Sequence, residues 1–404
     1  MTDSLPRPKL AVVSPFLDKQ HGTERIVAEW IERLAGRFEI HIYSQRVADV
    51  DLSRVTWHRI PKLPGPHLFS FLWWFAANRI SRSWHRRFRG LRPDLVFSPG
   101  VNCLDADAVS VHVVFAEYTR KHRHQLRLHA NPVSAWPRLV HRRLYYAFVI
   151  GLERRLYTNP RVALIATSRN TVAGLESSIA RSHVSRTVYP GLDLEIFNRA
   201  NRAALRPQAR QTLGLSGDRF TLLLVGNDWR NKGLPVLLDA LAQLRGLAVD
   251  LLVVSREESA DARDAVRGKS LEGRVHFCPP RKDVEFYYAA ADAYAGPSLE
   301  DTFALPAAEA MACGLPVIVS AEAGVSEIVT DGVDGLILRD PLDAAGLATM
   351  IRGLFEDAEW RERLGRCASD TARKYTWERS ASDLADTFNA ILSGKTKAST
   401  TGAS

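Results

Sequence analysis

The chain has 404 residues, of which 46% are hydrophobic and 25% are charged. This length suits two domains of ~200 residues each, and the composition excludes a disordered, collagen-like or disulfide-rich protein. The four cysteines lie far apart without a C-x-x-C pair, which fits a reducing compartment and excludes a cysteine-only zinc site. The start of the chain lacks the apolar core of a signal peptide, and no apolar stretch reaches the ~20 residues of a membrane span, so a soluble or peripheral cytoplasmic protein is expected.

The net charge of +9 is concentrated in one segment of the chain. Residues 79–161 hold 16 Lys and Arg against 5 Asp and Glu, a surplus of 11 that leaves −2 for the rest. Such a local surplus predicts one anionic partner surface near that half of the protein.

Both halves of the chain alternate apolar runs with helical patterns. In the first half, strands are predicted at 10–13, 38–43, 94–98, 108–115 and 162–167, with helices at 26–34 and 139–157. In the second half, strands are predicted at 220–225, 249–254, 275–277, 293–295 and 316–319, with helices at 234–244, 284–291, 306–312 and 377–392. This alternation predicts two doubly wound α/β domains, each with a parallel sheet covered on both faces.

Turn residues and polar runs predict the domain boundaries. Pro190 and Gly191, followed by a polar run at 198–211, predict the linker. Ligands of doubly wound sheets bind beyond the carboxyl ends of the strands, so the cleft between the domains is the expected site. The tail after the last helix is expected to be disordered. The expected divisions are 1–190, 191–372, a C-terminal helix at 373–393 and the tail at 394–404.

The densest cluster of candidate residues follows the fourth predicted strand of the second half. Pro306 suits a first helical turn, so free backbone N–H groups around Phe303 to Leu305 are expected to bind an anion. Asp301 and Glu309 flank that helix start, where carboxylates can accept hydrogen bonds from sugar hydroxyls. The alternative is that both carboxylates only stabilise the helix terminus.

A second loop, after the strand at 220–225, carries two cations. Arg230 and Lys232 precede Gly233, which opens the next predicted helix. A lysine point charge and an arginine fork beside a helix N-terminus suit a diphosphate. A solvated basic loop is the alternative interpretation.

The first half offers less specific candidates. Gly22 lies where the chain enters a helix, so its backbone could approach a phosphate closely, while the preceding His21 is equally well explained as a surface residue. His112 lies in a predicted strand, where a lone histidine is more often a core residue. Asp105 and Asp107 form a D-x-D pair, a pattern that can bind a divalent metal but is common by chance.

Leu68 to Gly90 have the pattern of an aromatic and basic amphipathic helix. Such a helix suits an anionic membrane surface, because rings settle among the headgroups and arginines meet lipid phosphates. A core-facing helix with a solvated basic side is the alternative, and a nucleic acid partner has no recognition signature to support it. The apolar positions on one face are Phe69, Leu72, Trp73, Ala76, Ile80, Trp84 and Phe88, with Arg79, Arg82, Arg86 and Arg89 on other faces.

The segment from Pro297 resembles the signature of the family 4 glycosyltransferases, E-x7-E with F-G-L-P inside. Asp301 and Glu309 take the two acidic positions, and Ala304 stands where glycine is usual. The likeness continues through EAMACGLPVI and GVSEIVTDGVDGLIL. The loop before it is similar to the family's V-G-R-x-x-x-x-K-G, with Lys232 as the pyrophosphate lysine and Asn227 in place of the arginine.

The closely spaced basic pair is similar to that of lipopolysaccharide-core glucosyltransferases, so Arg230 is expected to substitute for the missing arginine. The resemblance implies the GT-B fold, in which two Rossmann-like domains face each other across a cleft and the last helix crosses back to the N-terminal, acceptor-binding domain. It also implies catalytic roles for His112, Asp301, Lys232 and Arg230. The donor-binding residues that it implies are Gly22, Asn227, Arg230, Lys232, Thr302, Phe303, Ala304, Leu305 and Glu309.

The resemblance implies a retaining hexosyltransferase that needs neither a metal nor a cofactor. It would move sugar from a nucleotide diphosphate donor, UDP being the commonest choice, to a hydroxyl of a glycan or lipid-linked acceptor in envelope polysaccharide, lipopolysaccharide or glycolipid synthesis. The alternatives are a GT-B nucleotide-sugar epimerase or phosphorylase, and an impaired nucleotide-sugar-binding scaffold, since Asn227 and Asp301 depart from the usual pattern. The predicted location is cytoplasmic, peripheral on the inner face of the cell membrane.

Overall fold

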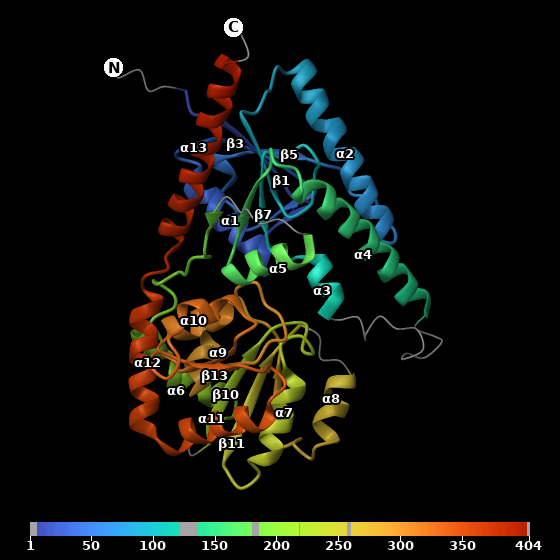
Figure 1. Cartoon of the computed structure of the whole chain (residues 1–404). Helices are drawn as coiled ribbons and strands as arrows, with labels where there is room; N and C mark the ends of the chain where they lie inside the picture. Colours follow the sequence, from blue (N-terminus) through green and yellow to red (C-terminus); the bar gives the residue numbers. More distant parts are fainter. Residues whose placement is uncertain (1–5, 122–135, 180–185, 218, 257–259, 402–404) are drawn as a thin grey trace, which may run out of the picture. The chain divides into compact units, whose positions relative to one another are not determined.

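The structure is a computed structural model that describes residues 6–121, 136–179, 186–217, 219–256 and 260–401. The chain divides into two compact units (Figure 1). Unit 1 comprises Met1–Tyr189 and Trp377–Ser404, and unit 2 comprises Pro190–Thr376.

Within its described residues, unit 1 is built on a seven-stranded parallel sheet in the order β5-β3-β1-β6-β7-β8-β9, and β2 pairs with β4 beside it. The first strand in sequence lies in the middle and later strands are added on both sides of it, which is the doubly wound arrangement. The strands are β1 Lys9–Val13, β2 Phe16–Leu17, β3 Glu39–Ser44, β4 Arg46–Val47, β5 Thr56–Arg59, β6 Leu95–Pro99, β7 Ala108–Val111, β8 Ala163–Ala166 and β9 Arg186–Thr187.

The helices of unit 1 include the last helix of the chain. That helix packs on α1, where the Trp30 indole N–H donates to the Ser380 hydroxyl (2.8 Å) and the rings of Phe38 and Phe388 meet edge to face at 5.9 Å. The helices are α1 Gly22–Leu34, the 3₁₀ turn η1 Leu52–Arg54, α2 His67–Phe88, α3 Phe115–Lys121, α4 Trp136–Tyr157, α5 Arg169–Ile179 and α13 Trp377–Thr401.

Unit 2 repeats the doubly wound arrangement. Its described residues form a six-stranded parallel sheet in the order β12-β11-β10-β13-β14-β15, with Phe220 of β10 level with Val249 of β11. The strands are β10 Phe220–Val225, β11 Val249–Val254, β12 Val275–Cys278, β13 Ala293–Gly296, β14 Val317–Ser320 and β15 Leu336–Leu338. The helices are α6 Arg199–Thr212, α7 Leu234–Gln243, α8 Ala260–Arg267, α9 Glu285–Ala290, α10 Leu305–Ala312, η5 Gly324–Ile328, α11 Ala344–Glu356 and α12 Ala358–Ala372.

The inner strands are mostly apolar because helices cover both faces of each sheet. Every residue of β11 is buried, and both faces of β1 are closed from Leu10 to Val13. Continuous rather than alternating apolar runs are what such sheets require. The predicted fold class of two Rossmann-like α/β domains is therefore confirmed.

Three local predictions were wrong. The strand expected at 108–115 ends at Val111, because the chain turns at 112–114 into α3. The polar run at 198–211 is helix α6 and not a linker. The tail expected to be disordered from residue 394 is helical as far as Thr401, and the Lys395 ammonium is bound by Asp107 (2.6 Å) and by the Asp94 carbonyl (3.0 Å).

Helix α6 is stabilised by polar contacts that a composition-based prediction does not register. The Asn198 side chain accepts from the Asn201 amide at its N-terminus (2.8 Å). Arginines on one face then donate to carbonyl groups at the end of α9, including the Arg206–Ala291 bond of 2.7 Å, and Arg206 also pairs with Asp292 (2.5 Å). Guanidinium groups at a helix C-terminus satisfy its last carbonyls, so this polar helix is part of the unit 2 fold.

Candidate functional site

The strand order of each sheet creates one position where ligands usually bind. In unit 2 the direction of winding reverses between β10 and β13, which are neighbours although β11 and β12 separate them in sequence. Loops that follow such strands diverge and leave a crevice at the carboxyl edge of the sheet. The loops at 226–233 and 297–304, which carry Arg230, Lys232 and Asp301, are the two loops at this reversal.

The two loops are joined by backbone and side-chain contacts. The Leu299 amide donates to the Asn231 carbonyl, and the Asn231 side chain donates to the Glu300 carbonyl, both at 2.8 Å. Gly233 has a left-handed backbone (φ +82°), and a Cβ atom there would lie 2.1 Å from the Pro297 carbonyl oxygen. Only glycine allows this approach, so Gly233 fixes how closely the loops meet.

The contact between the loops places Lys232 directly on Asp301. The Lys232 ammonium is in ion-pair contact with one oxygen of the Asp301 carboxylate, and both side chains are mostly buried. The other oxygen accepts from the amides of Ala304 (2.8 Å) and Phe303 (3.3 Å). The expectation of free N–H groups at Phe303 and Ala304 was therefore wrong, because Asp301 already binds them. What the crevice presents is an oriented carboxylate beside an ammonium group.

Ala304 occupies a backbone conformation that favours glycine. It caps the start of α10 with φ +67° and ψ +60°, in the left-handed region. A Cβ atom in that region costs roughly 1–2 kcal/mol. The resemblance had marked this position as one where glycine is usual, and the backbone supplies the physical reason.

Ala304→Gly is expected to raise the free energy of unfolding by about 0.5–1 kcal/mol, because relief of the left-handed strain exceeds the added entropy of the unfolded chain. Ala307→Gly, inside α10, is the matched control and should lower it by about 1 kcal/mol. Urea unfolding of both variants measures the difference. Equal destabilisation by the two substitutions would contradict strain at Ala304.

Glu309 lies deeper than Asp301, inside α10. It is buried, and its carboxylate accepts from the Tyr288 hydroxyl at 2.7 Å. Burial, together with the charges of Asp301 and Glu309, raises the pKa of the Tyr294 hydroxyl. Sequence reasoning missed both tyrosines. The structure shows that Gly296 leaves room for the Tyr294 ring, since a Cβ atom there would lie 2.7 Å from it.

The remaining donor-side candidates lie at the margins of the two loops. Arg230 stacks on Trp229 at 4.3 Å and pairs with Asp261 at 2.8 Å, but the two charged side chains are 50% and 66% exposed, so this pair can be exchanged for a ligand at little cost. The Asn227 side chain accepts from the Arg256 amide (3.0 Å). Thr302 is partly exposed, and Leu305, the first residue of α10, is buried.

In unit 1, Gly22 begins α1 directly after the loop that follows β1 and β2. Asp18, in that loop, accepts from the His21 amide (3.1 Å) and from its ring (2.8 Å), so His21 is held by a buried carboxylate. No heavy atom lies within 4 Å of a Cβ built on Gly22, so the surrounding described residues do not require glycine there. Open space at a helix N-terminus is compatible with close approach of a ligand.

His112 follows β7 and is almost fully buried. Its Nε2 atom lies 2.9 Å from the Ser110 hydroxyl, and its ring lies 6.1 Å from that of Trp30. Burial lowers the pKa of His112 to about 4, so the ring is neutral at neutral pH. It can exchange a hydrogen bond with a hydroxyl but brings no positive charge.

Asp105 and Asp107 are already engaged by cations. Arg82 binds Asp105 through both terminal nitrogens (2.7 and 2.8 Å), while Asp107 contacts Lys395 and accepts from the Val96 amide. Across the residues that the structure describes, no three His, Cys, Asp or Glu side chains gather in a way that could hold a metal ion.

Glu153 is a buried carboxylate that sequence reasoning did not single out. From α4 it accepts from the amides of Phe115 (2.8 Å) and Ala116 (3.2 Å), the first residues of α3. Burial raises the pKa of this carboxyl to about 7 in spite of those bonds. Glu153 thereby ties α4 to the helix that starts three residues after His112.

Glu153→Gln is expected to change how stability depends on pH. A raised pKa means that the folded state holds the proton more tightly, so the unfolding free energy falls as pH rises from about 4.5 to 7, by about 3 kcal/mol. The variant lacks this pH dependence, so its free energy of unfolding should rise relative to that of the native protein by about 3 kcal/mol between pH 5 and pH 8. Urea unfolding at both pH values measures it. Glu176→Gln, at an exposed position, is the control. If the unfolding free energy depended on pH in the same way in all three proteins, the raised pKa of Glu153 would be contradicted.

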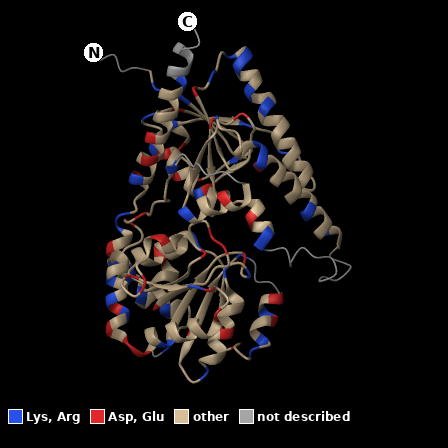
Figure 2. Cartoon of the chain, viewed as in Figure 1, with Lys and Arg blue, Asp and Glu red and all other residues tan. Residues whose placement is uncertain are grey.

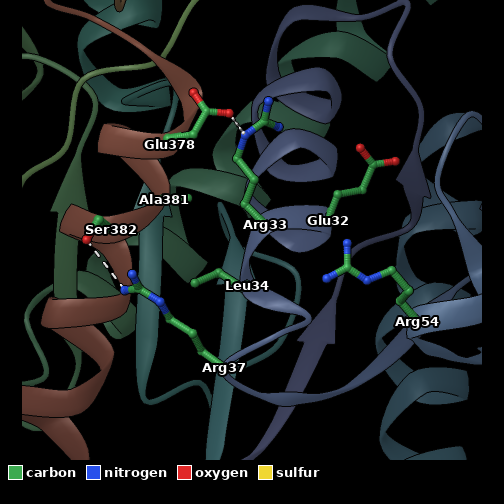
Figure 3. A pocket seen from close by; sticks show the side chains of 8 residues that line it. All are labelled: Glu32, Arg33, Leu34, Arg37, Arg54, Glu378, Ala381 and Ser382. Atoms are coloured by element: carbon green, nitrogen blue, oxygen red, sulfur yellow. Dashed lines mark hydrogen bonds and ion pairs between the residues drawn. The ribbon is translucent and has the colours of Figure 1, made fainter.

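A separate hollow of about 450 Å³ lies in unit 1 between α1, η1 and α13 (Figure 3). Two bonds cross it to α13, one from Arg33 of α1 to Glu378 (2.8 Å) and one from Arg37, just after α1, to Ser382 (3.4 Å). Its arginines gather at the C-terminal end of α1, where cations offset the helix dipole. None of the predicted site residues lines it, so it is not part of the candidate site.

Comparison with known proteins finds a family match within unit 2. Residues 219–357 match the family described as glycosyl transferases group 1. The chain carries a group 1 glycosyltransferase domain. The D-inositol 3-phosphate glycosyltransferase of Arthrobacter sp. is 32% identical over 212 residues, which are 50% of this chain and 49% of that protein. The chain thus spans about half the length of the curated relatives it matches.

Solved structures extend the likeness to nearly the whole chain. WaaG, a glycosyltransferase involved in lipopolysaccharide biosynthesis, superposes with a TM-score of 0.76 at 19% identity, covering 93% of this chain and 98% of its own. Anabaena Alr3699/HepE in complex with UDP-glucose superposes with a TM-score of 0.70 at 18% identity, covering 95% and 99%. At these identities the likeness shows the fold, and the group 1 glycosyltransferase domain lies within a GT-B fold.

Proposed function

We propose that this protein is a retaining hexosyltransferase. It transfers sugar from a nucleotide diphosphate donor, a UDP-sugar, to a hydroxyl of a glycan or lipid-linked acceptor in envelope polysaccharide, lipopolysaccharide or glycolipid synthesis. The observation that carries the proposal is the Lys232–Asp301 contact at the β10–β13 reversal of a group 1 glycosyltransferase domain. We further propose a cytoplasmic location, peripheral on the inner face of the cell membrane.

On the donor side, each charged group has a distinct role. Lys232 and Arg230 stabilise the negative charge that develops on the leaving diphosphate. Asp301, oriented by two backbone amides, accepts hydrogen bonds from the transferred sugar, and Glu309 accepts from the ribose hydroxyls. Asn227, Thr302, Phe303, Ala304 and Leu305 line the donor. A UDP-glucose complex of a protein with the same fold supports a nucleotide-sugar donor.

From unit 1, Gly22 is a proposed contact of the donor, and the neutral His112 is a proposed contact of the transferred sugar or the acceptor hydroxyl. A buried imidazole with a pKa of about 4 suits hydrogen bonding to a hydroxyl and not electrostatic stabilisation of a phosphate. The reaction we propose proceeds at the front face of the sugar, with the leaving phosphate accepting the proton of the attacking hydroxyl. It uses no metal and no cofactor.

Calorimetric titration with UDP, GDP and ADP, with and without magnesium, tests the donor assignment. The expected result is binding of UDP that does not depend on magnesium. A separate assay with UDP-glucose should show slow release of UDP. Binding of UDP without any turnover of UDP-sugars, in the presence of glycan and lipid acceptors, would favour the scaffold. Failure to bind any of the three nucleotides would refute the proposed function.

A further inference from the structure

The surface of unit 1 formed by α2 and α4 exposes many large hydrophobic side chains. Fourteen large hydrophobic side chains are exposed among the described residues, and eight of them lie on these two helices. Isolated exposed apolar residues need no explanation, but a gathering of them marks an interaction site. On α2 they are Phe69, Leu72, Ile80, Trp84 and Phe88, and on α4 they are Trp136, Val140 and Leu144.

The exposed residues of α2 form a stripe along the whole helix. Phe69, Leu72, Ala76, Ile80, Trp84 and Phe88 follow one another at spacings of three or four residues, and all are exposed. Phe69, Ile80 and Phe88 are more than 60% exposed. Residues at these spacings share one side of a helix. The stripe therefore faces away from unit 1.

The opposite side of α2 is firmly attached to the unit. The buried Trp74 indole donates to the Asn102 carbonyl (3.1 Å), and Arg82 makes its two bonds to Asp105. Phe71 packs edge to face on Tyr145 of α4 at 5.6 Å, so the two helices lie against each other (Figure 1). The stripe is thus the free face of a fixed helix and not the inner face of a displaced one.

The charge on the two helices has one sign. Within α2 and α4, all of whose residues the structure describes, the single acidic residue is Glu153, and it is buried. Basic side chains are exposed beside the apolar residues, and Figure 2 shows lysine and arginine colouring along both helices. The exposed arginines are Arg79, Arg86 and Arg87 on α2, with Arg138, Arg142, Arg143, Arg154 and Arg155 on α4.

We propose that this α2–α4 surface docks on an anionic lipid bilayer. Apolar and aromatic side chains would enter the headgroup region while the arginines meet lipid phosphates, which is how an interfacial helix binds. A second copy of the chain is a poorer occupant, because two surfaces of the same positive sign repel. The proposal deepens the proposed function, since it selects a lipid-linked acceptor over a soluble glycan, but vesicle binding itself does not depend on that function.

The surface is also connected to the proposed acceptor side. Helix α4 carries the exposed Val140 and Leu144 on one side and the buried Glu153 two turns further along. Glu153 holds the first amides of α3, which follows His112. A helix anchored in the headgroups would therefore position the loop that carries His112.

Co-sedimentation with vesicles tests the proposal. The intact protein should bind phosphatidylcholine vesicles that contain about one third phosphatidylglycerol, bind pure phosphatidylcholine far more weakly, and dissociate as salt rises. Ile80→Ser with Phe88→Ser should lower the partition coefficient at least about tenfold. Arg79→Gln with Arg86→Gln should lower it about fivefold for each charge, on anionic vesicles alone. Val140→Ser with Leu144→Ser should weaken binding in the same way, because these residues belong to the same surface.

Matched controls come from unit 2. Ile196→Ser with Leu342→Ser also removes two exposed apolar residues, and Arg363→Gln with Arg366→Gln removes two exposed charges, so both variants should sediment like the native protein. Circular dichroism and UDP titration, expected to be unchanged in every variant, separate loss of lipid binding from loss of fold or of donor binding. The proposal would be overturned if the native protein did not bind vesicles, or if the variant Ile80→Ser with Phe88→Ser bound them as well as the native protein does. It would also be overturned if the native protein formed a dimer that this variant does not form.

Discussion

Lys232→Met is expected to lower kcat/KM for the UDP-sugar by about 100- to 1000-fold and to weaken UDP binding by at least about tenfold. The ammonium group is the one cation that the loop contact places directly on Asp301, at the carboxyl edge of β10 and β13. Methionine preserves the length of the side chain and removes the charge. The measurement is a steady-state assay of UDP release together with calorimetric titration of UDP.

A second substitution separates the role of the charge from that of the ion pair. Asp301→Asn also breaks the pair, yet it leaves Lys232 in place for the diphosphate, so UDP should still bind while turnover falls. Lys282→Met, at an exposed position in the same unit, is the control and should behave like the native protein. If the two site variants lose UDP affinity equally and unfold equally early, the Lys232–Asp301 pair only supports the fold.

Gly233→Ala is expected to destabilise unit 2 by about 3 kcal/mol or more. The left-handed backbone (φ +82°) alone costs an alanine roughly 1–2 kcal/mol. The new methyl group would also lie 2.1 Å from the Pro297 carbonyl oxygen, a distance that forces the two loops apart. Displaced loops cannot bring Lys232 to Asp301, so the variant should lose UDP binding as well.

Gly332→Ala is the matched control for this substitution. Gly332 has a similar backbone (φ +76°), but no heavy atom lies within 4 Å of its Cβ position, so only the backbone strain of about 1 kcal/mol remains. Urea unfolding of both variants, monitored by circular dichroism, gives the difference in unfolding free energy that the Pro297 contact causes. Equal destabilisation at the two positions would show that the loops move apart without cost.

Sequence patterns predicted where the charged loops of unit 2 lie because the relevant signals are local. Apolar runs and helical periodicity predicted the central strands and placed the charged loops after β10 and β13. The parallel order of a doubly wound sheet then brings the carboxyl ends of those strands to one edge, although more than 60 residues separate Lys232 from Asp301. Pairing of the two side chains follows from topology, and topology follows from the alternation of strands and helices.

Other parts of the site depend on contacts that leave no local pattern. Tyr288 reaches Glu309 from a different helix, and Glu153 reaches α3 from α4 across 37 and 38 residues. The amides at Phe303 and Ala304 seemed free because helix starts usually leave such groups unbonded, yet Asp301 turns back to bind them. Helix α6 seemed a linker because its polarity hides contacts made to carbonyl groups of α9.

The sequence by itself determined the class of fold, the division into two halves, the family that residues 219–357 match and the loops of unit 2 that carry charge, because each of these depends on residues close together in the chain. The tertiary structure decided which charges meet, which amides are already bonded, and which face of α2 stays exposed. Those outcomes depend on distances between elements far apart in sequence, and they are set by the packing of the sheets and by close approaches such as that of Gly233 to Pro297.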